Sequence, residues 1–205
     1  MNSVPAAWSA QSDWGIRLRE PPPTSIDDEL TAARAGNSAA LGALVRTHQR
    51  AIYSLALRML GTRDLAEDLT QDVFMQLSDN LHRIETHAHL VFWLRRVTTY
   101  RAIDQLRRRS LIEMTPLDPE AQIFSTEDHG DPLLQRHLRA LLADLSPDAR
   151  AVLLLRYQED LDPLEIARTL DMPINTVKSH LRRSLDAMRQ KLAVTTESRR
   201  EDHSL

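Results

Sequence analysis

Hydrophobic residues recur every three or four positions along most of this 205-residue chain, which is the spacing of an α-helix with one buried face. Ser25 is placed to cap a first helix, with an aspartate three positions later as a variant of the capping box. The residues AGN at 35–37 end that helix, Asn37 or Ser38 can cap a second, and Gly61 ends the second. The apolar stripe of this second helix consists of Leu41, Leu44, Val45, Ile52, Leu55, Ala56 and Met59.

Two further helices are predicted before the pattern breaks. The third runs from about Arg63 to Asp79, and the fourth starts near Thr86 or Ala88 and continues to about Arg109. The buried side of the third helix is formed by Leu65, Leu69, Val73 and Leu77.

Proline and glycine interrupt every helical pattern between residues 110 and 132, and helices resume after that point as far as about Leu192. Residues 1–24 show no sustained periodicity either. We therefore predict an all-α protein with two small helical domains joined by a flexible acidic linker. The predicted division is a flexible tail at 1–24, a first domain at 25–109, the linker at 110–132, a second domain at 133–193 and a polar tail at 194–205.

Composition excludes several classes of protein. No apolar run approaches the roughly 18 residues that span a membrane, and the N-terminus has no secretory signal, so we expect a cytoplasmic protein without membrane insertion. The chain has no cysteine, no P-loop, no Ser–His–Asp arrangement and no paired-carboxylate site. His87 and His89 have metal-ligand spacing but lack a third convincing ligand. We expect neither catalytic residues nor a metal or cofactor.

Charge is segregated along the chain, although the net charge is only −3. Between residues 93 and 109, six arginines accompany a single aspartate, and between 174 and 191 five basic residues accompany another. The linker at 110–132 holds six carboxylates and no lysine or arginine. Two cationic helices separated by an anionic segment indicate two separate contacts with nucleic acid.

The second cationic segment has the pattern of a helix-turn-helix. Asp162 precedes Pro163, which is a good start for a short amphipathic helix, and the residues DMP at 171–173 turn the chain into a basic helix. In that motif the first turns of the second helix enter the major groove. The side chains expected to face DNA there are Asn175, Thr176, Lys178, Ser179, His180, Arg182 and Arg183. Those expected to face inward are Val177, Leu181, Leu185, Met188 and Leu192.

Two families of transcription protein share this string. NTVKSHL resembles the output domain of LuxR/NarL-type regulators, whereas the whole stretch LSPDARAVLLLRYQEDLDPLEIARTLDMPINTVKSHLRRSLDAMRQKL resembles region 4 of the extracytoplasmic-function (ECF) sigma factors. The first half separates them, because a response regulator would carry a receiver domain with strands. Instead DLAEDLTQDVFMQL at 64–77 resembles sigma region 2.2, and FWLRRVTTYRAIDQLRRR at 92–109 resembles regions 2.3 and 2.4. The chain is therefore identified as a member of the ECF sigma factors.

This resemblance implies a partner for each charged surface. Core RNA polymerase would bind through the clamp helices of its largest subunit, and also through its flap. The residues expected to bind the clamp helices are Asp64, Glu67, Asp68, Gln71 and Asp72. Promoter DNA would meet region 4 at the −35 element and region 2 at the −10 element. The residues expected at the −10 element are Arg95, Arg96, Arg101, Asp104, Arg107 and Arg108. An anti-sigma factor is a further expected partner, and the free protein is expected to be a monomer.

Some positions refine this expectation. The loop 82–90 would form the pocket for a flipped base, and Phe92 and Trp93 could stack on bases, although their spacing favours a core role for at least one of them. Family members often have asparagine where Tyr100 stands, which alters any contact carried over to that position.

Two alternatives remain at this stage. A LuxR/NarL-type regulator would bind promoter DNA without polymerase. A sigma mimic would sequester an anti-sigma factor through a sigma-like surface, but mimics tend to lose the basic residues that this chain keeps at 107–109 and 178–183. A buried interface between the two domains would suggest self-inhibition, but nothing in the sequence shows one.

Overall fold

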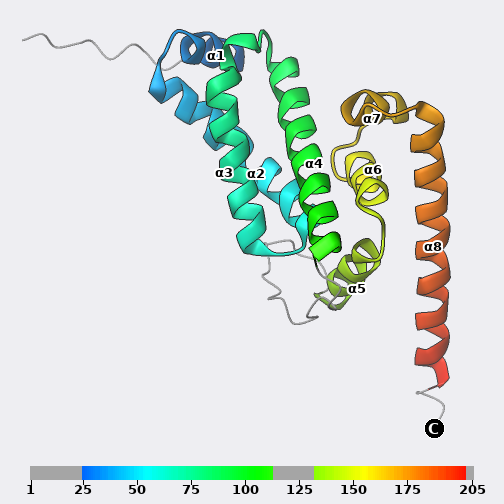
Figure 1. Ribbon diagram of the computed structural model, residues 1–205. Helices are drawn as coiled ribbons and strands as arrows, with labels where there is room; N and C mark the ends of the chain where they lie inside the picture. Colours follow the sequence, from blue (N-terminus) through cyan, green and yellow to red (C-terminus); the bar gives the residue numbers. More distant parts are fainter. Residues whose placement is uncertain (1–24, 113–131, 202–205) are drawn as a thin grey trace, which may run out of the picture.

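The computed structural model describes residues 25–112 and 132–201, with side chains described for 25–110 and 138–192. All regular elements in these ranges are helices, so the all-α prediction is confirmed for them. In chain order the elements are α1 (Ile26–Arg34), α2 (Ser38–Leu60), α3 (Arg63–Asn80), the 3-10 helix η1 (Leu81–Arg83), α4 (His87–Ile112), α5 (Pro132–Ala143), α6 (Pro147–Tyr157), α7 (Pro163–Leu170) and α8 (Ile174–Glu201) (Figure 1).

The ends of the first helices follow the predicted capping residues. The Ser25 hydroxyl accepts a hydrogen bond from the Asp28 N–H at 3.1 Å, and the Asn37 side chain accepts from two N–H groups at the start of α2. Gly61 ends α2 with φ of 81°, a left-handed conformation that a side chain would strain. These caps set the lengths of α1 and α2 and the direction in which α3 leaves.

Helices α1 to α4 pack as one unit whose core comes from the predicted stripes (Figure 1). Leu44, Leu55 and Met59 of α2 are fully buried against Val73 and Leu77 of α3. Leu65, predicted for the same side of α3, is only half-buried.

Helices α6 and α7 lie between α4 and α8, which places the second half of the chain directly beside the first (Figure 1). Leu155, Ile166 and Val177 are buried, one each from α6, α7 and α8. The buried residues of both halves form one continuous hydrophobic cluster. Nothing in the sequence indicated an interface between the two predicted domains, and the structure contains one, in which α6 packs against α2 and α4, and α7 packs against α4.

Several boundaries differ from the prediction. Helix α4 continues to Ile112, into the expected linker, and α8 continues to Glu201, into the expected polar tail. The apolar pattern fades near Leu192, which is 42% exposed rather than inward-facing, but no glycine or proline follows Pro173 to stop the helix. The flexible tail predicted at 1–24, and residues 113–131 of the predicted linker, lie outside the described residues.

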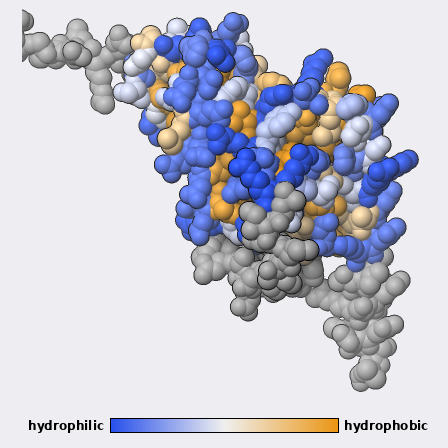
Figure 2. All heavy atoms as spheres, in the orientation of Figure 1, coloured by the Kyte–Doolittle hydropathy of each residue, from blue (hydrophilic) through white to orange (hydrophobic). Residues whose placement is uncertain are grey.

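On the face seen in Figure 2, hydrophilic side chains predominate and hydrophobic atoms show in strips between the helices. Within the described ranges, every helix is too short or too polar to cross a lipid bilayer.

Candidate functional site

Helices α7 and α8 form the predicted helix-turn-helix. The Asp162 carboxylate accepts hydrogen bonds from the N–H groups of Leu164 and Glu165 at 2.7 and 2.8 Å, and the Glu165 carboxylate accepts from the Asp162 N–H at 2.7 Å. This reciprocal capping box fixes the start of α7. Asp171 ends α7 in the left-handed conformation, with φ of 49°, and so turns the chain into α8.

The start of α8 presents a polar surface, because Val177 and Ser184 face inward and are almost fully buried. Of the seven side chains predicted to face DNA, five are exposed and two, Ser179 and His180, are half-buried. The exposed ones are Asn175, Thr176, Lys178, Arg182 and Arg183. We call these seven side chains the recognition surface.

The predicted carboxylate row of α3 is exposed. We call it the acidic face, and its members are Asp64, Glu67, Asp68, Gln71 and Asp72. Arg63 donates to Glu67 across 2.6 Å, and this contact raises the pKa of the guanidinium above its ordinary value. Both side chains are more than half exposed, so solvent screens the pair and it adds little stability.

An apolar groove of about 790 Å³, which the sequence did not predict, runs beside the acidic face between α2 and α3. Tyr53, Phe74 and Met75 line it, and Glu67 and Gln71 lie on its polar side. Met75 is 61% exposed, an unusual state for a large hydrophobic side chain on an otherwise well-packed unit. The acidic face therefore borders an apolar depression.

Helix α4 carries the six side chains predicted for the −10 element, and each of them makes a contact within the chain. Three stay within the first half: Arg101 binds Asp72 and Gln76, and Arg108 binds Asp104. The other three reach the second half of the chain, and they are Arg95, Arg96 and Arg107.

Arg96 and Tyr100 meet the carboxyl end of α7. The Arg96 guanidinium donates to the carbonyl oxygens of Arg168 and Thr169 at 2.8 and 3.2 Å, and the Tyr100 hydroxyl donates to that of Leu170 at 2.9 Å. The guanidinium also lies over the Tyr100 ring, 4.9 Å from its centroid. The last carbonyls of a helix lack partners in their own helix and carry partial negative charge.

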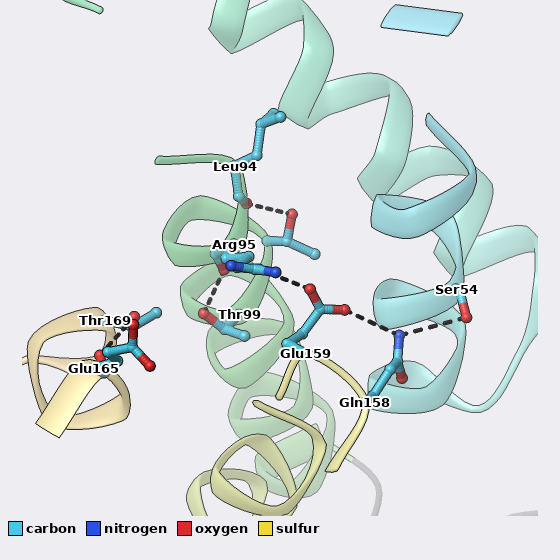
Figure 3. A network of polar contacts seen from close by, with 9 residues as sticks. Ser54, Leu94, Arg95, Thr99, Gln158, Glu159, Glu165 and Thr169 are labelled. Atoms are coloured by element: carbon cyan, nitrogen blue, oxygen red, sulfur yellow. Dashed lines mark hydrogen bonds and ion pairs between the residues drawn. The ribbon is translucent and has the colours of Figure 1, made fainter. Parts of the chain in front are cut away.

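Arg95 continues this contact on the other side of α4. It donates to Glu159 at 2.7 Å, and both side chains are largely buried, at 26% and 11% exposed. Figure 3 shows Arg95, Glu159, Gln158 and Ser54 in one row of polar contacts, which joins α4, the loop after α6, and α2. Further along α4, Arg107 makes a more exposed ion pair with Asp148.

Arg150 of α6 is a buried charge that the sequence reasoning missed. Its guanidinium is 8% exposed and donates to the carbonyls of Leu142 and Ala143 at the end of α5 and of Met59 at the end of α2. Burial lowers its pKa. A single arginine thus satisfies the ends of two helices, one from each half of the chain.

His48 and His87 lie against each other where α4 begins beside α2, with ring centroids 5.2 Å apart. Their Nε2 atoms are buried without a hydrogen-bond partner. Burial lowers the pKa of His48, and the neighbouring His87 and Arg95 lower it further. Among the described side chains, no three histidine or acidic groups come together as a metal site would require.

Two known domain types match the chain. The profile of sigma-70 region 2 matches residues 44–112, and that of sigma-70 region 4 matches residues 135–188. The ECF RNA polymerase sigma factor SigE of Mycolicibacterium smegmatis is 33% identical over 191 residues, which cover 89% of this chain and 72% of that protein. This chain belongs to the ECF family of RNA polymerase sigma factors.

Other relatives agree with this assignment. The ECF sigma factor SigW of Bacillus subtilis is 26% identical over 186 residues, covering 82% of this sigma factor and 96% of SigW. Among solved structures, the sigma factor RpoE of Bartonella quintana, bound to the anti-sigma factor NepR, aligns with a TM-score of 0.63 at 21% identity, over 75% of this chain and 96% of that one. CnrH, bound to the cytosolic domain of CnrY, aligns with a TM-score of 0.58 at 21% identity, over 82% and 97%. These structures share the fold.

Membership of this family decides between the two interpretations of the helix-turn-helix, which were a LuxR/NarL-type output domain and sigma region 4. As an ECF sigma factor, the protein directs transcription initiation at promoters, and residues 44–112 match region 2 rather than a receiver domain. Trp93 packs against the core while Phe92 is 38% exposed, so one of the two aromatic residues has the predicted core role.

Proposed function

We propose that this sigma factor docks on core RNA polymerase through the acidic face and its groove, and places α4 on the −10 element and the recognition surface on the −35 element. It acts in the cytoplasm, is a monomer when free, and is held inactive by an anti-sigma factor until it is needed. It has no catalytic residues, cofactor or metal of its own, since the polymerase performs the chemistry.

The observation that carries the proposal is the pairing of an exposed acidic face with an apolar groove on α3. Carboxylates one helical turn apart repel one another by about 0.2–0.5 kcal/mol per pair, which a cationic partner relieves. The exposed Met75 and the ring of Phe74 offer apolar area beside them. A basic helix pair, such as the clamp helices of the largest polymerase subunit, satisfies both features at once.

At the −35 element, the capping box and the turn at Asp171 orient α8 so that its first turns can enter the major groove. Lys178, Arg182 and Arg183 are exposed there and suited to phosphates or to guanine edges. The flap of the polymerase would hold region 4 on the −35 element while region 2 is on the −10 element.

At the −10 element, α4 would hold the DNA backbone and help to open the duplex. Separating the strands costs about 1.4 kcal/mol per stacking step, and capture of a flipped base in the loop 82–90 would offset part of that cost. The exposed ring of Phe92 is available for stacking on an unpaired base.

Run-off transcription with core polymerase on genomic fragments tests the proposal. We expect specific transcripts only when core and this protein are both present. A LuxR-type regulator would protect promoter DNA without core, and a decoy would bind an anti-sigma factor without supporting transcription. Absence of core-dependent initiation on every fragment, with a known sigma factor active in the same reactions, would refute the proposal.

A further inference from the structure

The contact between α4 and the second half of the chain uses the side chains that the proposed function assigns to promoter DNA. Arg95, Arg96 and Arg107 each bind an acceptor on α6, on α7 or on the loop between them. We propose that this contact is an autoinhibitory latch, which covers part of the DNA-binding surface of α4 until the two halves separate. The inference rests on the proposed role of α4 at the −10 element.

The chemistry of the latch resembles that of the ligand it would exclude. The carbonyl oxygens of Arg168, Thr169 and Leu170 lie at the negative end of α7. They offer α4 a group of acceptors with partial negative charge, which is what a phosphate backbone offers. Because Nη1 of Arg96 is occupied by two of these carbonyls, a phosphate that approaches the same edge of the guanidinium must compete with α7.

Tyr100 gives the latch its specificity. Its hydroxyl donates to Leu170, and its ring lies beneath the Arg96 guanidinium and fixes the direction in which that side chain points. A shorter polar side chain at this position could not support both contacts. Tyr100 thus joins α4 to α7 through two separate interactions.

The acidic face and the recognition surface remain outside the latch. The members of the acidic face lie on α3 and are all exposed, whereas Arg95 and Arg96 of α4 are half-buried under the second half of the chain. The polymerase can therefore engage region 2 first, and opening follows when region 4 is drawn to its own site. DNA contact by α4 is thereby made to depend on prior binding to polymerase.

The latch can be measured as a distance. The chain has no cysteine, so Asp79→Cys with Gln190→Cys provides two specific labelling sites, both exposed, on α3 and α8. We expect the free wild-type protein to give one narrow distance distribution by double electron–electron resonance. Glu159→Gln should add a second population at a different distance and raise the opening equilibrium about tenfold, the factor expected for a hydrogen bond between charged groups.

Two further variants keep the test specific. Asp160→Asn makes the same change in net charge next to Glu159, at an exposed residue whose φ of 52° suits asparagine, and should leave the distances unchanged. Tyr100→Phe keeps the ring and removes only the hydroxyl, and should raise opening about fivefold. Thermal melting confirms that each variant is folded.

Binding of a 20-nucleotide single-stranded DNA of mixed sequence, without polymerase, tests the inhibition itself. The apparent affinity of a ligand that binds only the open state rises in proportion to the open fraction. Glu159→Gln should therefore bind this DNA more tightly, by the same factor by which its open fraction rises, and Asp160→Asn should bind it as the wild type does. Equal distances in all proteins would overturn the latch, and opening without a gain in affinity would overturn its inhibitory role. Run-off transcription separates the two proposals. If no transcripts form although the variants open as expected, the proposed function is refuted and the contact between the two halves of the chain still stands.

Discussion

Replacing the buried Arg150 by methionine is the sharpest test of how the two halves of the chain hold together. The guanidinium is 8% exposed and donates to three carbonyls, two at the end of α5 and one at the end of α2. Methionine keeps most of the apolar stem and removes every one of these donors, so the change isolates the polar contribution.

The expected loss follows from these contacts. A buried acceptor left without a partner costs about 1–3 kcal/mol. The substitution also removes the cost of burying the positive charge, and this burial lowers the pKa of Arg150. That gain offsets part of the free energy lost when three carbonyls are left without a donor. We expect the free energy of unfolding to fall by about 3 kcal/mol.

Urea denaturation, followed by circular dichroism, measures the change. With a slope of about 3 kcal/mol per molar urea, the midpoint should fall by about 1 M. Arg156→Met is the matched control, since Arg156 lies on the same helix but donates to a single carbonyl, that of Leu161. It should cost only about 1 kcal/mol. If the two variants denature at the same urea concentration, Arg150 does not bridge the two halves in solution and the reasoning is refuted.

Three further outcomes are expected. The pKa of His48 is lowered in the folded state, so the unfolded chain binds more protons than the folded chain as the pH falls below about 6.5. The melting temperature should therefore drop between pH 7.5 and 5.5, and it should drop less in His48→Gln. Reversing the charges of Asp64 and Asp68 to lysine should abolish core binding in a pull-down while leaving the melting temperature nearly unchanged, because both side chains are exposed. Arg182→Ala and Arg183→Ala should each lower the salt dependence of promoter binding by the holoenzyme by about one unit of slope.

Each of these outcomes has a control. An equal acid-induced drop in wild type and His48→Gln would remove His48 as the titrating group. Lysine substitutions at the exposed Asp27 and the half-buried Glu29 of α1 change charge elsewhere on the chain, and an equal loss of core binding there would contradict a specific role for the acidic face. An unaltered salt slope would exclude phosphate contact by the two arginines.

Local structure was largely predictable because its causes are local. Ser25, Gly61 and Asp162 mark helix ends by chemistry that acts within a few residues, and all three have the predicted positions. The stripes of α2 and α3 gave most of the core for the same reason. The predicted end of α8, near Leu192, was wrong because the apolar stripe fades there while the helix continues to Glu201, and the sequence has no helix-breaking residue in between.

The contacts between the two halves of the chain could not be predicted, because they depend on single residues rather than on a repeated pattern. Nothing near Glu159 in the sequence indicates Arg95, which lies 64 positions away, or marks the arginine at 150 as buried. The arginines of α4 are expected to face DNA from their number and spacing, which stays a prediction, but the sequence did not indicate that three of them contact α6, α7 or the loop between them in the free chain. Tyr100, which the resemblance had marked as an unusual residue for this position, is part of the interface, but nothing in the sequence connects it with Leu170.

The position of Tyr100 constrains how this protein can evolve. Its hydroxyl donates to Leu170 of α7, and its ring lies under the Arg96 guanidinium. If α4 reads the −10 element as proposed, a mutation of Tyr100 that adjusts promoter preference also changes how readily the two halves of the chain separate. Selection for a new target gene and selection for silence in the absence of a stimulus therefore act on one codon. Lineages that change one trait are expected to show compensating substitutions at the facing end of α7.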